Sequence, residues 1–131
     1  MAERSSGQTI GVTVSALLII AIGGGIGSGL RWLLVLLIPS PRSGFPVAIT
    51  VVNVAGSFIL GLVVGADIGA TAPVDIDAGT IGVLGGFTTF STWLVDVDRA
   101  GPDQSTAIAA VPLALGFMAA MFGLLLGAAL A

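Results

Sequence analysis

The sequence predicts an all-α membrane protein with four transmembrane helices, the third of which is broken. The 131-residue chain is 56% hydrophobic and only 8% charged, and its mean hydropathy is +1.13. Soluble domains carry about 25% charged residues, so this composition indicates a bilayer protein. A helix needs about 20 mostly apolar residues to cross a bilayer. Four windows meet that length and place the whole chain, residues 1–131, in a single four-helix transmembrane domain: roughly 12–38, 45–66, 79–97 and 106–131.

The composition also excludes several classes of chemistry. The chain has no cysteine and no histidine, so disulfides, thiolate metal sites and the commonest proton relay are absent. Its seven carboxylates all lie at the ends of the windows or in the connections. We therefore expect no enzyme, because an acid/base pair, a metal cluster and an activated nucleophile are lacking. With four arginines and no lysine, the chain also lacks the clustered basic residues that a nucleic-acid partner requires.

The first window, 12–38, is too long for a secretory signal, and we expect the chain to retain it. It ends at Pro39, where the turn-forming stretch "PSPRSGFP" begins. Glycines spaced by four, such as Gly23 and Gly27, allow membrane helices to approach closely. Arg31 lies about two turns before Pro39. Its guanidinium can either reach the nearer membrane interface or place a positive charge at the vestibule of a pore.

The second window, 45–66, carries a polar face inside an apolar helix. In "TVVNVAGSFILG" the residues Thr50, Asn53 and Ser57 follow at spacings of three and four, which puts their side chains on one face. Two hypotheses remain open for this face. Asn53 can hold a neighbouring helix by a hydrogen bond worth on the order of 1 kcal/mol, or it can take part in function.

The third window, 79–97, contains the most polar run found inside any of the four windows, "GGFTTFSTW", from Gly85 to Trp93. Adjacent glycines followed by adjacent threonines weaken a helix, and irregular backbone at membrane depth is tolerated only where protein or a watery cavity satisfies it. The run therefore predicts a broken helix and a buried ion site. Freed carbonyls can hold a hard cation such as Na⁺. The ring edges of Phe90 and Trp93 carry partial positive charge and, beside Ser91 and Thr92, can contact a dehydrated anion.

The fourth window, 106–131, is apolar after its first residue: from Ala107 to Ala131 it has no Ser, Thr, Tyr or Asn. The sequence gives little indication of membrane orientation, because positively charged residues in the connections are few. Arg4 falls on one side of the membrane, and Arg42 and Arg99 fall on the other. This weak bias is compatible with insertion in both orientations.

Three motifs resemble the CrcB/Fluc family of fluoride channels: "GGGIGSGLRWLL", "TVVNVAGSFILG" and "GGFTTFSTW", in that order. The resemblance covers most of the chain, most loosely its C-terminal quarter. It implies a multi-pass protein of the cell inner (plasma) membrane that forms an antiparallel, dual-topology dimer in the lipid bilayer. It also implies passive export of cytoplasmic fluoride through two pores, each lined by both subunits.

The resemblance assigns roles to individual residues. Asn53 donates to fluoride, Phe90 and the residue at position 93 form an aromatic box, and the backbone carbonyls of Gly85 and Thr88 hold a structural Na⁺ at the dimer interface. Arg31 matches the arginine of the family's first span. Together with the polar face of the second window, the expected ion pathway comprises Arg31, Thr50, Asn53, Ser57, Phe90, Ser91, Thr92 and Trp93.

Two departures from the family pattern keep alternatives open. Trp93 stands where the family usually has a second phenylalanine, and its indole can donate to an anion or obstruct the path. The fourth window lacks the family's polar track. The chain is therefore either a homodimeric channel or the pore-incomplete subunit of a paired heterodimer, and a non-conducting assembly partner is a third hypothesis. A small multidrug-type transporter is disfavoured, because it needs a carboxylate that window 12–38 lacks.

Overall fold

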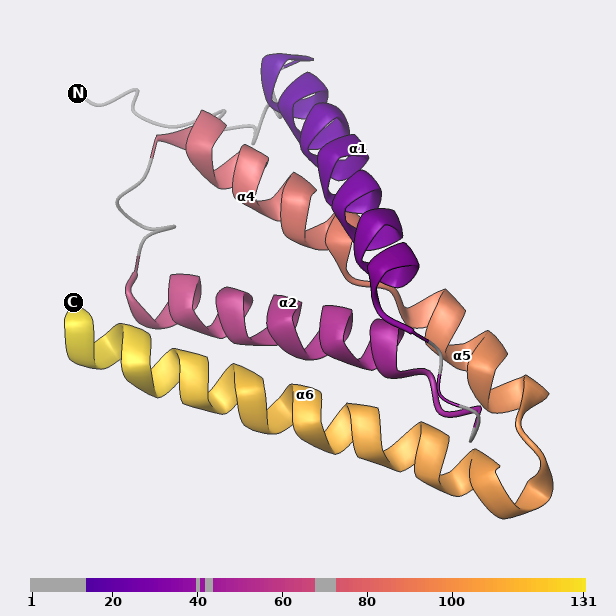
Figure 1. Cartoon of the computed structure of the whole chain (residues 1–131). Coiled ribbons are helices and arrows are strands. Elements are labelled where there is room, and N and C mark those ends of the chain that lie inside the picture. The colour runs from indigo at the N-terminus through magenta and orange to yellow at the C-terminus, as the bar shows by residue number, and fades with distance from the viewer. Residues whose placement is uncertain (1–13, 40, 42–43, 68–72) are drawn as a thin grey trace, which may run out of the picture.

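The computed structural model of the protein describes residues 14–39, 41, 44–67 and 73–131. Regular structure in these residues is helical throughout, and Figure 1 shows its arrangement. Arg4 and Arg42, two of the arginines on which orientation depends, lie outside the described residues. The helices are α1 (Val14–Leu37), α2 (Val47–Gly65), α4 (Val74–Phe87), α5 (Phe90–Arg99) and α6 (Pro102–Leu130).

Four segments are long and apolar enough to cross a membrane, which confirms the predicted all-helical, four-span architecture. α4 and α5 together make the third of them, from Ile76 to Arg99. The helices run further than the apolar windows into the last connection, where only Ala100 and Gly101 separate α5 from α6. Pro102 in the first turn of α6 and Asp103 beside it explain this early start, because proline and acidic residues both favour helix N-termini.

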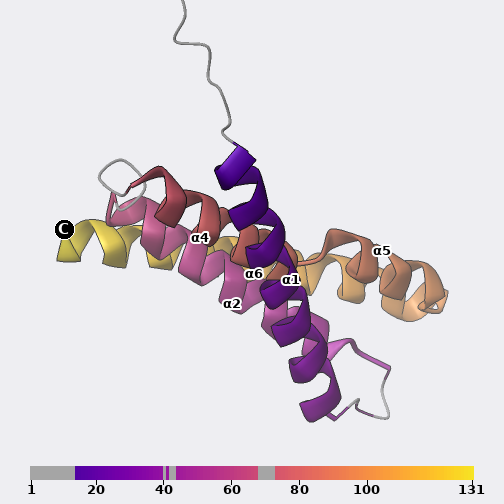
Figure 2. The ribbon, with the colours of Figure 1, turned by 90° about the horizontal axis from the view of Figure 1, so that it is seen from above.

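The helices form two tightly packed pairs, α1 with α4 and α2 with α6 (Figures 1 and 2). Glycine makes both contacts possible. A Cβ atom built on Gly86 of α4 would collide with the carbonyl of Gly24 in α1, and one on Gly61 of α2 would lie 3.0 Å from the backbone nitrogen of Leu124 in α6. The backbones of each pair are therefore in direct contact, as small residues allow in membranes.

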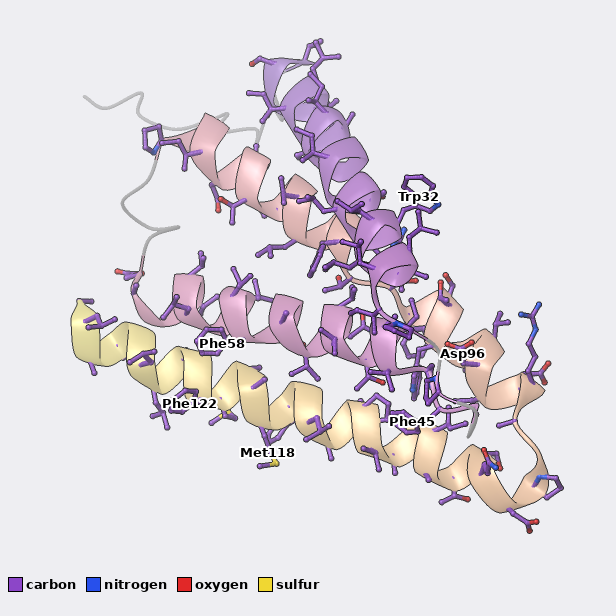
Figure 3. All side chains as sticks on the ribbon, viewed as in Figure 1. Trp32, Phe45, Phe58, Asp96, Met118 and Phe122 are labelled. Atoms are coloured by element: carbon purple, nitrogen blue, oxygen red, sulfur yellow. The ribbon has the colours of Figure 1, made fainter. Side chains whose placement is uncertain are left out.

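The two pairs contact each other little, and they diverge from the end at which α5 lies (Figure 1). A cavity of about 770 Å³ lies between α2 and α4. Most large apolar side chains are exposed, and Val52 is the largest fully buried one among the described residues. Figure 3 shows Trp32 and Met118 pointing outward from α1 and α6. Such surfaces suit contact with lipid or with another subunit.

The third span is interrupted at Thr88 and Thr89, which confirms the predicted break. Both residues are extended, with ψ of 154° and 123°. Thr88 caps the C-terminus of α4, and Thr89 caps the N-terminus of α5. The Thr88 hydroxyl donates to Leu84 O at 2.9 Å, and Thr89 Oγ1 accepts from the backbone N–H of Thr92 at 3.3 Å as the N-cap of α5.

Candidate functional site

The centre of the site is a reciprocal pair of hydrogen bonds between Asn53 of α2 and the break. Asn53 Nδ2 donates to Thr89 O at 2.9 Å, and the backbone N–H of Thr89 donates to Asn53 Oδ1 at 2.8 Å. The amide thus replaces helical partners that the extended backbone has lost. Because a side-chain amide carries two N–H groups, one bond to Thr89 O leaves the second N–H for another acceptor.

Two side chains of α1, the helix packed against α4, also reach the break. Ser28 Oγ donates to Gly86 O at 3.3 Å, and Arg31 Nη1 donates to Thr88 O at 3.4 Å. The Arg31 guanidinium therefore lies against the C-terminal end of α4, where the helix dipole favours positive charge. Side chains from α1 and α2 thus stabilise the same interruption from both sides.

The backbone carbonyls of Gly85 and Thr88, at the end of α4, are among those that have lost their helical donors. A continuous helix would bring the N–H of Thr89 to Gly85 O and that of Thr92 to Thr88 O. Here Thr89 N–H goes to Asn53 Oδ1, and Thr92 N–H goes to Thr89 Oγ1. Gly85 and Thr88 both line the 770 Å³ cavity. Backbone oxygens freed by a helix break are ligands for Na⁺ in membrane proteins, so these two residues fit a Na⁺ ion.

Side chains offer no alternative metal site in the part of the chain that the structure describes. No group of three or more His, Cys, Asp or Glu comes together there. A Cβ atom built on Gly85 would meet nothing within 4 Å, so the space beside this residue is open. A cation at this end of α4 would therefore depend on backbone oxygens.

The hydroxyls of the break form a small cluster around Thr89, which is 8% exposed. Thr89 Oγ1 donates to Thr92 Oγ1 at 3.1 Å and lies 3.4 Å from Ser91 Oγ. Thr89 lines the 770 Å³ cavity. Ser91 and Thr92 do not line it, but their hydroxyls contact Thr89 Oγ1. Thr89 was not among the site residues predicted from the sequence. The signal was available in principle, since a threonine directly before a new helical segment is a typical N-cap.

Two aromatic rings of α5 lie beside the cluster. Phe90 and Trp93 have ring centroids 5.0 Å apart at an interplanar angle of 49°. Phe90 is 68% exposed in the single chain and lines both the large cavity and a second one of about 290 Å³. Trp93 lines only the second cavity, and its Nε1–H donates to Ile108 O in α6 at 2.9 Å.

The three polar residues on the shared face of α2 do not all reach the cavities. Ser57 lines both cavities together with Asn53. Thr50 is buried, lies one turn earlier, and donates its hydroxyl to Pro46 O at 2.9 Å within the first turn of its own helix. Thr50 lines neither of these two cavities.

A family model described as "CrcB-like protein, Camphor Resistance (CrcB)" matches residues 18–128. This chain belongs to the CrcB family. Among its relatives, the fluoride-specific ion channel FluC of Deinococcus radiodurans is 41% identical over 119 residues, covering 85% of this chain and 94% of the relative. FluC 1 of Symbiobacterium thermophilum is 40% identical over 118 residues, covering 83% and 94%. FluC 3 of Streptomyces avermitilis is 39% identical over 114 residues, which are 82% of this chain but only 56% of that protein.

The CrcB match includes the polar face of α2, the break and the α5 aromatics, so the whole site lies within the region shared with the family. The resemblance noted in the sequence is confirmed. The relatives are named as channels and not as enzymes, in agreement with the expectation from composition. With its four apolar spans, this CrcB protein is a multi-pass membrane protein.

Proposed function

We propose that this chain is a subunit of a fluoride channel of the plasma membrane that lets cytoplasmic fluoride leave passively. The observation that carries the proposal is the polar break in the third span. It lies in a chain about 40% identical, over most of its length, to proteins named fluoride-specific ion channels. A pore for a small, strongly hydrated anion must replace water by closely placed hydrogen-bond donors.

Three groups at the edge of the two cavities suit that task. The second N–H of Asn53 and the hydroxyl of Ser57 are neutral donors, and the edge of the Phe90 ring carries partial positive charge. All three residues line both cavities. The positive charge of Arg31 at the end of α4 raises the anion concentration near the break.

The functional unit in this proposal is an antiparallel dimer of dual topology. The 770 Å³ cavity has an apolar wall from α2 and α4 that includes Leu60, Val64, Ile81 and Leu84. Within the described chain no further helix covers this wall, and Phe90 stands exposed at its end. A second copy would bury the wall and complete the pathway. A pairing of inverted subunits also agrees with the weak arginine bias.

A paired heterodimer is the second candidate, because α6 contributes no hydroxyl to the pathway. Its part of the smaller cavity consists of Pro112, Leu113, Gly116, Phe117 and Ala120. A partner subunit with a polar fourth span would supply what this helix lacks. The small multidrug-type alternative has no support at the site, since α1 contains no carboxylate.

In the dimer, Gly85 and Thr88 of both copies would bind a structural Na⁺ through their carbonyl oxygens. Two oxygens come from each chain, and the ion would supply positive charge that joins two helix ends. A carbonyl has two lone pairs, so the 3.4 Å bond from Arg31 to Thr88 O leaves one for the ion.

Efflux from liposomes tests the proposal. Purified protein reconstituted into KF-loaded vesicles should release fluoride when valinomycin balances charge, and chloride should stay inside. Protein that is silent alone and conducts when mixed with a second family member would identify the heterodimer. Silence under both conditions would exclude a channel.

The aromatic group has a matched pair of variants. Phe90→Ile removes the ring edge and should abolish efflux while the dimer persists in size-exclusion chromatography. Phe122→Ile makes the same change in a ring that stacks on Phe58 at 6.0 Å, outside both cavities (Figure 3). Its efflux should match that of the parent. Equal efflux from both variants would remove Phe90 from the pathway.

A further inference from the structure

Pro112 lies inside α6 and leaves one carbonyl of that helix without its usual donor. A helical residue four positions after Ile108 would normally donate its backbone N–H to Ile108 O, but proline has none. Both Ile108 and Pro112 are buried. A buried carbonyl without a partner is costly, and in a membrane span water does not satisfy it.

Trp93 supplies the missing donor. Its Nε1–H points from α5 to Ile108 O at 2.9 Å, a short and direct hydrogen bond between two helices that are adjacent in sequence and antiparallel in space. The indole N–H can only donate, so this bond uses its whole polar capacity. Phenylalanine at this position could not make the bond.

The same bond fixes the place of the neighbouring ring. The Trp93 indole lies 5.0 Å from Phe90, and Phe90, Trp93 and Pro112 together line the 290 Å³ cavity. Contacts between α5 and α6 are few compared with those inside the two helix pairs, so a single directed bond has a large share in holding α5. α5 also has no buried residue of its own.

We infer that Trp93 and Pro112 form an interhelical clamp, in which the indole N–H satisfies the carbonyl that the proline frees and thereby holds the Phe90 ring at the edge of the cavities. Trp93 is then a positioning residue. Its N–H is engaged by Ile108 O and does not bind the anion. Tryptophan at position 93 and proline at position 112 form a matched pair, because proline without the indole N–H leaves Ile108 O without a donor.

A double-mutant cycle in detergent tests the clamp without any fluoride measurement. Replacing Trp93 by 3-benzothienylalanine keeps the two-ring shape but removes the N–H. With Pro112 present, this replacement should lower Tm by about 4 °C, because the buried carbonyl of Ile108 then has no hydrogen-bond donor. With Pro112→Ala, the introduced backbone N–H bonds Ile108 O, so the same replacement should change Tm by less than about 1 °C. Equal losses in the two backgrounds would overturn the clamp and leave Trp93 as a packing residue.

Trp93→Phe serves as a second probe, and Trp32→Phe is its matched control. Trp32 is 65% exposed on the outer side of α1 (Figure 3), so its replacement should be insensitive to the residue at position 112. A Trp32→Phe effect that also depends on Pro112 would show that the proline acts on the whole fold and would overturn the specific pairing.

The link to the pathway rests on the proposed function and has its own readout. In vesicles, the 3-benzothienylalanine variant should slow fluoride efflux several-fold with Pro112 present, and Pro112→Ala should restore it. If the loss of Tm depends on Pro112 as expected but the efflux rate is unchanged, the clamp is supported and its role in positioning Phe90 is overturned. If the parent protein itself is silent, the proposed function fails, whereas the cycle in detergent still decides the clamp.

Discussion

Asn53 is the residue on which the geometry of the break depends most directly. Its amide both donates to and accepts from Thr89, at 2.9 and 2.8 Å, and this reciprocity requires one donor and one acceptor on the same planar group. The two hypotheses left open by the sequence, interhelical bonding and an ion-binding role, are therefore compatible. One N–H bonds the break, and the second N–H remains for another acceptor at a residue that lines both cavities.

Asn53→Asp should reduce fluoride efflux by at least about 100-fold. An ionised carboxylate can accept from Thr89 N–H but cannot donate to Thr89 O, and it places negative charge on an anion pathway. The measurement is efflux from vesicles at matched protein density. Gln104→Glu makes the same chemical change at an exposed position in the first turn of α6 and should leave efflux unaltered. Fluoride flux in Asn53→Asp equal to that of this control would contradict the donor role.

The break in the third span and the shared face on α2 were predictable from the sequence, but the hydrogen-bond partners of these residues were not. A cluster of glycine and threonine inside an apolar run is enough to predict the break, and spacing alone puts Asn53 and Ser57 on one face. The partner of Trp93 was not predictable, because Pro112 lies in another helix and one sequence does not give the register between helices. Thr50 shares the face of Asn53, yet a hydroxyl in a helix can also bond back to its own carbonyls, as it does here to Pro46 O.

At the level of elements, glycine determines which helices pair. The chain has 20 glycines, many spaced by four, and such patterns are compatible with several pairings. The structure selects α1 with α4 and α2 with α6. Only the three-dimensional contacts distinguish glycines that touch a neighbouring backbone from glycines that face open space, and for that reason the pairing was not predicted.

Gly86→Ala should destabilise the fold, whereas Gly85→Ala should not. A Cβ atom at Gly86 would overlap the carbonyl of Gly24, a backbone atom that cannot move without shifting α1, and such overpacking costs about 1–3 kcal/mol. The neighbouring position has nothing within 4 Å. Thermal unfolding in detergent should therefore show a lower Tm for Gly86→Ala only. A similar loss of Tm in both variants would argue against close contact between α1 and α4.

At the level of the whole molecule, the single chain leaves a large cavity open and buries few apolar side chains. A cavity of about 770 Å³ opens between its two helix pairs, and among the described residues the buried Ala, Val and Ile side chains are those of Ala16, Ile49, Val52, Ala78 and Ile108. Lipid can cover the outer faces of the helices. The cavity wall differs from them because it ends at polar groups of the break, which need protein or water as partners.

For the proposed dimer, the freed carbonyls of Gly85 and Thr88 predict a dependence on Na⁺. An ion bound by Gly85 and Thr88 of both proposed copies would stabilise only the dimer, and this stabilisation would grow as the Na⁺ concentration rises above the dissociation constant of the ion. Replacing Na⁺ by N-methylglucamine at constant ionic strength should therefore shift the protein toward monomer in size-exclusion chromatography and slow fluoride efflux, and restoring Na⁺ should reverse both changes. Constant ionic strength separates this effect from general screening of charges. Gly85→Ala keeps the backbone oxygen and should retain the dependence on Na⁺. A dimer and an efflux rate that are indifferent to Na⁺ would mean that these carbonyls are satisfied without a cation, with Arg31 as the remaining positive group at Thr88 O.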